Sequence, residues 1–446
     1  MKTLWLATGL FIVSNLNGQD LQELLRQAES SYPLLKAKAF EVQAGKSNVS
    51  SARSTALPTL DAAYQLNYAT GNNITGMVST QFIVPMTGPP SSGNDYGGVY
   101  GSAGGLLLNW EPFTFGQRRA RIDVARANLH FNEADAKQEI FKHQINVINT
   151  YLDVLMTHEL LKVYIKNLER SKENVRVVQT LTTTGLRPGV DTALFNAELS
   201  KAKIDLLNQS RFLETRRAEL AELLATKNLI YSYDSSYFHS LPLFPEDTVS
   251  SVHPIVALSQ SKLEINQYQR AFVQRSLYPK LTAWGTTYAR GSGIHYDGTV
   301  NSKDGLSFSR YNYGVGLQLS VPLLRFLDVR NQLHQQSALI NSQQERLKQV
   351  ELDLYKQRVV ADLTLRNSLE IAHESPVLFE SAEFGYRSLS TRYNAGMTNY
   401  ADLVQAQYGL VKAETDLKKS YLECWKALLY EAAVQGDLNV FLKQVK

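Results

Sequence analysis

Residue types that carry out covalent chemistry or bind metals are scattered through this 446-residue chain. Its eight His residues show no metal-ligand spacing, and none lies beside a Ser or Cys in a recognisable nucleophile motif. Cys424 is the only cysteine, so neither a disulfide within the chain nor a cysteine-based metal site can form. We therefore expect no enzymatic activity, no catalytic residues, no cofactor and no metal site built from His or Cys.

Two segments combine a glycine with a carboxylate in a repeated pattern. Residues 182–199 read "TTTGLRPGVDTALFNAEL", and residues 393–407 read "YNAGMTNYADLVQAQ". In each segment an Asp follows a Gly by six positions: Asp191 follows Gly185, and Asp402 follows Gly396. Gly allows the chain to reverse, and Asp191 is placed to N-cap a helix that starts after the turn. The pattern predicts two short turns between antiparallel helices, because such short connections join neighbouring helices.

Long helices are predicted to lead into both turns. Residues 117–184 contain neither Gly nor Pro and are rich in good helix formers. At 1.5 Å per residue, one continuous helix here would be about 100 Å long, which no compact globular domain needs. The matching stretch 325–393 contains Pro376 and Gly385, and we expect Pro376 to kink or break its helix. Return helices are predicted at 192–229 and 399–434, and shorter helices at 20–56 and 254–276.

Four segments change to an alternation of two residues, which is typical of strands. Residues 60–68 and 311–321 each present one apolar, aromatic face and one small or polar face, while 99–110 and 280–290 are their less regular hairpin partners. Long, Gly-rich, polar segments connect the partners, as in transmembrane barrels. The alternative is a soluble sheet whose apolar face is its core. Four strands cannot close a barrel, and open edges are not allowed in lipid, so strands in a membrane require a barrel shared by several chains. A dimer would supply eight strands and a trimer twelve.

The N-terminus has the layout of a secretory signal peptide. Lys2 precedes an apolar run at 4–13 and a polar exit, so we expect a signal peptide over residues 1–18 with cleavage near Gly18. No Cys lies near this site, which excludes a lipid-anchored N-terminus. No later run of about 20 apolar residues predicts a transmembrane helix. The charge of +4 is small and interspersed, which argues against nucleic acid as a partner.

The chain repeats its own signals at a spacing of about 210 to 220 residues. The matching positions are Pro33 and Pro254, Pro58 and Pro279, Pro112 and Pro322, and Gly185 and Gly396. We therefore predict two structural repeats, 19–230 and 253–446, joined by a linker at 231–252. Each repeat has the order helix, β-hairpin, long helix, tip turn, return helix. The predicted hairpins span 57–113 and 279–322, and the predicted tip turns span 182–191 and 393–402.

This order of elements, together with the motifs "NWEPFTFGQRRARI" and "YNAGMTNYADLVQAQ", resembles the TolC-like outer-membrane efflux protein family, the outer membrane factors. The resemblance covers essentially the whole mature chain. It implies a mixed α/β membrane protein in the cell outer membrane. Long antiparallel α-helices would form a coiled-coil tunnel in the periplasm, and four β-strands per chain would contribute to a shared 12-stranded transmembrane β-barrel in a homotrimer.

The resemblance also implies a function and partners. The trimer would be the exit duct for an inner-membrane efflux or secretion pump, joined to it by a periplasmic adaptor protein, and its barrel would contact outer-membrane lipid. Family members do no covalent chemistry, and cargo specificity resides in the pump. The competing class is a non-transport periplasmic coiled-coil scaffold or adaptor with a soluble β domain. Adaptors usually carry a single helical hairpin, so the doubled layout disfavours this alternative.

Within the resemblance, the two Gly turns become the periplasmic tips at which an idle duct closes. The family's tip Tyr, which bonds to a first-half Asp, corresponds to Tyr393 and Asp191. The family's inner acidic ring corresponds to Asp402, and its second acidic position is Gln405 here. Carboxylates that converge on one axis attract cations and can bind a divalent ion in a narrow pore. The alternative role for Asp402 is a helix cap or a solvated surface carboxylate.

One of the contacts that close the tip in the family is changed in this sequence. Thr398 replaces the latch Arg after the turn glycine, and Val190 replaces its first-half partner. Arg187 could substitute for the missing Arg from the other turn.

Overall fold

A computed structural model of the chain describes residues 21–70, 72, 77–78, 83–84, 93–227, 233–245, 252–295, 297 and 299–445. The predicted signal peptide and its cleavage site lie outside these residues. The chain divides into two compact units. We call Met1–Gln43, His130–Lys262 and Gln343–Lys446 the helical unit, and Ala44–Leu129 and Leu263–Ser342 the sheet unit. Each unit draws on both halves of the sequence, so the compact units are not the predicted repeats.

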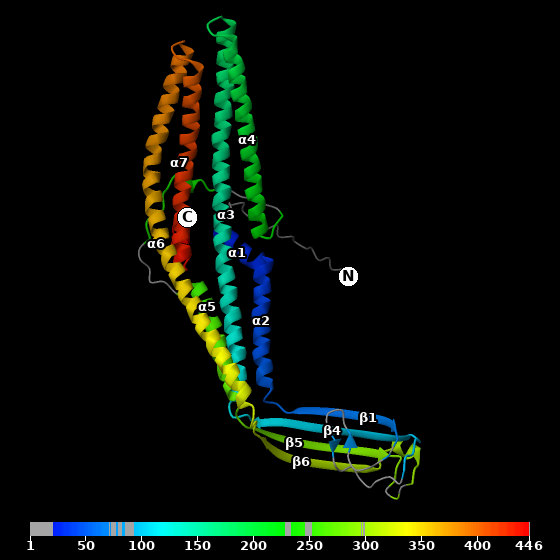
Figure 1. Cartoon of the computed structure of the whole chain (residues 1–446). Helices are drawn as coiled ribbons and strands as arrows, with labels where there is room; N and C mark the ends of the chain where they lie inside the picture. The colour runs from blue at the N-terminus through cyan, green and yellow to red at the C-terminus, as the bar shows by residue number, and fades with distance from the viewer. Residues whose placement is uncertain are drawn as a thin grey trace, which may run out of the picture. The chain divides into compact units, whose positions relative to one another are not determined.

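Long helices make up most of the chain (Figure 1). They are α1 (Leu21–Ser31), α2 (Pro33–Ser54), α3 (Gln117–Thr183), α4 (Gly189–Leu223), α5 (Pro254–Arg275), α6 (Phe326–Asn394), α7 (Tyr400–Gln435) and α8 (Asn439–Leu442), with 3₁₀ turns η1 (Ser236–Phe238) and η2 (Ser302–Leu306). Within the helical unit, α4 returns beside α3, α7 returns beside α6, and both turns lie at the same end (Figure 1). No helix among the described residues is long and apolar enough to cross a membrane.

Pro376 does not break α6, so that part of the expectation is wrong: this 69-residue helix runs through both Pro376 and Gly385. Proline lacks an N–H and therefore removes one helical hydrogen bond. The bond that is lost is the one to the carbonyl of Ala372, and the hydroxyl of Ser375 does not replace it, because it donates to the carbonyl of Ile371 across 2.7 Å. The many remaining bonds of the helix and its buried contacts outweigh the local loss.

The strands form one antiparallel sheet in the order β1 (Thr59–Ala69), β4 (Val99–Phe113), β5 (Lys280–Ser292), β6 (Arg310–Ser320). A separate pair, β2 (Met77–Val78) and β3 (Ile83–Val84), lies in the segment between β1 and β4. Both predicted hairpins are present, and pairing of β4 with β5 joins them into a single sheet. We call the end where the strands meet α2, α3, α5 and α6 the helix end, and the opposite end the loop end.

The register sorts the strand side chains onto two faces, because directly paired residues point to the same side. The apolar face contains Leu60, Tyr64, Leu66, Tyr68, Tyr100, Gly104, Leu106, Leu108, Ala289, Gly291, Tyr311, Tyr313, Val315, Leu317 and Leu319. The polar face contains Asp61, Gln65, Asn67, Ala103, Gly105, Trp284, Thr286, Tyr288, Arg290, Arg310, Asn312, Gly314, Gly316 and Gln318. On the apolar face, Tyr313 and Val315 are 88% and 81% exposed in the single chain. This face is therefore not packed as the core of a soluble domain.

Glycines on the polar face of β6 make room for an aromatic ring. A Cβ atom at Gly316 would lie 2.7 Å from the indole of Trp284, and one at Gly314 would lie 3.3 Å from it. The predicted small residues of this strand thus border a crowded surface.

The core of the helical unit lies where α1, α3, α4, α6, α7 and η1 meet. Its fully buried members include Leu24, Ile148, Leu152, Leu365 and Leu428. Trp425 packs in this core between Tyr237 and Phe441, and its indole N–H donates to the carbonyl of Ser240 across 3.2 Å. Helices with neighbours on several sides bury more than one stripe of side chains along their surface.

Candidate functional site at the two helical turns

Both turns close with the same backbone pattern. Gly185 and Gly396 have φ of 74° and 77°, in the left-handed region that favours glycine. The N–H of each Gly donates to the carbonyl three residues earlier, and the next N–H donates to the carbonyl five residues before it. This pair of bonds is the Schellman motif, which satisfies carbonyls left unpaired at the end of a helix. The two glycines therefore end α3 and α6 in the same way.

The two return helices begin differently. Helix α4 starts at Gly189 after Pro188, so Asp191 lies in its first turn and the expected N-cap role of Asp191 is wrong. Helix α7 is capped by Asn399, whose side-chain oxygen accepts from the N–H of Asp402 across 2.9 Å. The exposed Asp402 carboxylate in turn accepts from the hydroxyl of Thr398 across 2.7 Å. An acid in the first turn of a helix is favoured by the helix dipole.

A buried hydrogen bond connects α6 to α4 near the turns. The phenol of Tyr393, 1% exposed, donates to Oδ2 of Asp191, 9% exposed, across 3.1 Å. Burial, followed by the hydrogen bond to the Asp191 carboxylate, raises the pKa of Tyr393 to about 12. The phenol therefore stays protonated at neutral pH and remains a donor. Hydrogen bonds to an ionised acceptor are stronger than neutral ones.

Arg187 connects the first turn to the second. Its Nη2 donates to the carbonyl of Thr398 across 2.6 Å and to the carbonyl of Tyr393 across 3.2 Å. Its guanidinium carbon lies 4.4 Å from the centroid of the Tyr393 ring, a cation–π distance. A cation at the C-terminal end of α6 also interacts favourably with the helix dipole.

An apolar cluster surrounds these polar links. It consists of Val175, Val178, Phe195, Tyr393, Leu403 and Val404. Phe195 packs against the rings of both Tyr393 and Tyr400, with centroids 5.6 Å and 4.8 Å apart. The phenol of Tyr400 donates to the carbonyl of Leu194 across 3.3 Å, and burial, with Glu198 nearby, raises the pKa of Tyr400 to about 12. The cluster keeps water away from the Tyr393–Asp191 bond, and bonds shielded in this way are stronger.

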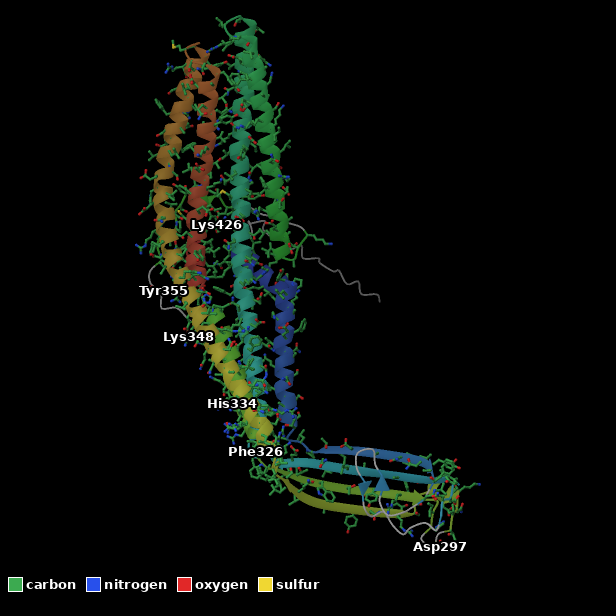
Figure 2. The ribbon with its side chains drawn as sticks, in the orientation of Figure 1. Asp297, Phe326, His334, Lys348, Tyr355 and Lys426 are labelled. Carbon is green, nitrogen blue, oxygen red and sulfur yellow. The ribbon has the colours of Figure 1, made fainter. Side chains whose placement is uncertain are left out.

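A run of polar contacts between α3 and α7 continues from this cluster, and we call it the polar seam. Gln407, 5% exposed, donates to Asn167 and Ser171 and accepts from Asn174, each across 2.9 Å. Glu414 binds Lys166 and Arg170 at 3.2 Å and 3.1 Å. Further along, Lys426 of α7 (Figure 2) binds Asp153 across 2.7 Å.

Sequence reasoning missed the polar seam. Asn167 and Asn174, and likewise Gln407 and Glu414, are spaced by seven residues, the repeat of facing positions in coiled coils. That spacing of polar residues was the available signal.

The structure therefore brings together four of the predicted site residues, Arg187, Asp191, Tyr393 and Thr398, and it joins Asp402 to Thr398. Gln405 and Val190 are exposed and lie outside this group of contacts. Among the described residues, no three or more His, Cys, Asp or Glu side chains are grouped to hold a metal ion.

Known proteins share this fold. The VceC outer membrane protein of Vibrio cholerae matches with a TM-score of 0.74 at 14% identity, over 94% of this chain and 96% of its own. The CmeC outer membrane channel of Campylobacter jejuni matches with 0.74 at 14% identity, over 94% and 86%. The MtrE outer membrane channel of Neisseria gonorrhoeae, in its open state, matches with 0.71 at 15% identity, over 94% and 89%. No curated protein sequence matches this chain.

The family model described as "Outer membrane efflux protein" matches residues 24–226 and 253–423. The match covers α2 through α6, the whole sheet and both turns. Family and fold are those of channel proteins. The chain therefore belongs to the outer membrane efflux protein family, and it serves as an outer-membrane exit duct for efflux pumps.

Proposed function

We propose that the duct is a homotrimer in which three four-stranded sheets close one 12-stranded barrel. The observation that carries this proposal is the sheet itself. No described strand pairs with the outer edge of β1 or of β6, and the apolar face is exposed. Unpaired strand edges are not tolerated in lipid, so β6 of one chain would pair with β1 of the next. The four main strands span 11 to 15 residues, which is enough to cross a membrane when tilted.

In this assembly the apolar face lies against lipid and the polar face lines the pore. Interiors of such barrels are polar and their outer faces are apolar with aromatic residues, as here. The helical unit would extend the pore through the periplasm. A periplasmic adaptor protein and an inner-membrane pump would be its partners, and cargo selection would belong to the pump. The chain itself would carry out no covalent chemistry.

The two turns are proposed as the tip at which the idle duct closes. The Tyr393–Asp191 bond connects α6 to α4, and the two bonds of Arg187 connect the first turn to the end of α6 and to the second turn. Arg187 would thereby supply the cation that the second turn lacks, since Thr398 offers it only a carbonyl. Asp402 would face the pore of the trimer, where three such carboxylates would form a cation-attracting ring.

Fractionation and conductance test the proposal. The protein should fractionate with the outer membrane, run on gels as an oligomer that heat dissociates, and form water-filled pores in planar bilayers. Extraction with soluble periplasmic protein, without such an oligomer, would instead support a scaffold or adaptor with a soluble β domain.

A further inference from the structure

Two arginines face each other at the loop end of the sheet. Arg290 of β5 and Arg310 of β6 are direct register partners, so their side chains project from the polar face side by side. Both are exposed. Like charges placed directly opposite each other destabilise a strand pair. Stabilisation of the sheet therefore does not explain why two arginines lie opposite each other.

The described residues supply no carboxylate partner for either guanidinium. Arg310 donates only to the carbonyl of its neighbour Ser309, across 3.0 Å, and Arg290 forms no ion pair among the residues that the structure describes. The four main strands contain two carboxylates, Asp61 and Glu111, and both lie toward the helix end. Glu111 is 3.6 Å from Lys280 there.

Carboxylates of the described loop residues are bonded within their own segments. Asp304 accepts from His295 across 2.9 Å. Asp297, at the loop end of the sheet (Figure 2), accepts from the hydroxyl of Thr299 across 2.7 Å. Asp95 accepts from the N–H of Gly97 across 2.8 Å. None of these three contacts involves Arg290 or Arg310.

The segment that connects β5 to β6 folds over the other face. A Cβ atom at Gly291, on the apolar face, would lie 1.8 Å from the carbonyl oxygen of Ser307. Phe308 packs on the same face against Tyr64, with ring centroids 6.1 Å apart. These described loop residues thus cover the apolar face near its loop end and leave the two arginines open on the polar face.

We infer that Arg290 and Arg310 form an anion-attracting ring at the outer mouth of the duct. This inference rests on the proposed function, because the polar face lines the pore only in the closed trimeric barrel. Three chains would then place six guanidiniums around the water-filled lumen. Arginine binds carboxylate and phosphate groups in a planar, two-pronged geometry, so the ring suits solutes that carry these groups. Asp402, at the turns of the helical unit, would favour cations.

Reversal potentials of the purified trimer in planar bilayers under a KCl gradient test this inference. Arg290→Gln combined with Arg310→Gln should lower the chloride-to-potassium permeability ratio by about sevenfold, because a change of about one kT in pore potential shifts the chloride and potassium permeabilities in opposite directions. Arg290→Lys with Arg310→Lys keeps the charge and should keep the ratio. Lys303→Gln removes an exposed cation from η2, outside the strands, and should change the ratio little.

An unchanged ratio in the double Gln variant, with normal trimers and pores, would overturn the ring. A shift of equal size in Lys303→Gln would also overturn it, because the effect would then come from the overall charge. A fall of the chloride-to-potassium permeability ratio in the double Lys variant, as large as in the double Gln variant, would exclude charge as the cause and would also overturn the ring. Failure of the wild-type protein to form any pore would contradict the proposed duct itself, which separates the two failures.

Discussion

Tyr393 of α6 and Asp191 of α4 are 202 positions apart in the sequence, yet the phenol donates to the carboxylate across 3.1 Å. The bond is buried beneath Phe195 and lies next to Arg187, whose guanidinium stacks on the same phenol ring. It is thus one part of a small, dry contact that holds the ends of two helical hairpins together.

The first prediction concerns this bond. Tyr393→Phe with Asp191→Ala should raise the resting conductance of the duct in planar bilayers. A buried hydrogen bond to a charged group contributes about 2 kcal/mol, so the open fraction should rise roughly tenfold or more. The matched control is Tyr355→Phe, an exposed phenol on α6 far from the turn (Figure 2), which should leave conductance unchanged. No rise in the double variant would mean that other contacts close the tip.

The second prediction concerns Arg187. Its replacement by Ala removes both carbonyl bonds and the cation–π contact, so resting conductance should again rise by roughly tenfold. Arg187→Lys should rescue only part of the effect, because an ammonium cannot reproduce the planar fork over the ring. Arg392→Ala, which removes an exposed cation in the last turn of α6, is the control. If Arg392→Ala opens the duct equally, net charge at the tip explains the result and the specific contacts do not.

The third prediction concerns Asp402. In the trimer, Asp402→Ala should weaken block of single-channel current by divalent cations on the order of tenfold, since binding depends strongly on the number of charged ligands. Asp416 of the same helix, which is half-buried, is changed to Ala as a comparison away from the turn. Equal block in wild type and Asp402→Ala would remove Asp402 from the pore constriction.

The fourth prediction concerns acid stability and His253, which precedes α5. Its Nδ1 accepts from the N–H of Ile255 across 3.2 Å, and its Nε2 lies 3.0 Å from the carbonyl of Ala433. Burial lowers the pKa of His253 below its usual 6.5. The unfolded chain therefore binds the proton more readily, so this residue stabilises the fold above about pH 6.5 and the contribution is lost as the pH falls.

Thermal unfolding followed by circular dichroism between pH 5 and 8 tests that sign. His253→Ala should cost about 1 to 2 kcal/mol near pH 8 through the lost cap and hydrogen bond. The difference from wild type should shrink toward pH 5. His334→Ala, an exposed residue of α6 (Figure 2), should leave the pH profile unchanged. A difference that grows as the pH falls would contradict the assigned neutral state of His253.

Local signals in the sequence predicted the elements closely. Helix α3 spans Gln117–Thr183, against an expected 117–184, because an unbroken run of helix formers and a following Gly specify a helix without help from distant residues. The same holds for the strands. Successive side chains of a strand point to opposite faces, so the alternation of residue types is a local signal. The possible break of α6 at Pro376 was predicted wrongly. The loss of one backbone hydrogen bond is a local effect, whereas a long helix is stabilised by its contacts with neighbouring helices.

The sequence by itself determined the long helices, the glycine turns, the alternating strands and, through their order, the resemblance to a family. Only the tertiary structure decided that β4 pairs with β5, that Asp191 binds Tyr393 instead of capping α4, and that Arg187 reaches across to Thr398. The physical reason is that turns and periodicity arise from neighbouring residues. The pairing partner of a strand edge or of a buried polar side chain lies roughly 200 residues away in the sequence. Only the packing of the folded chain brings the two partners together and orients their side chains.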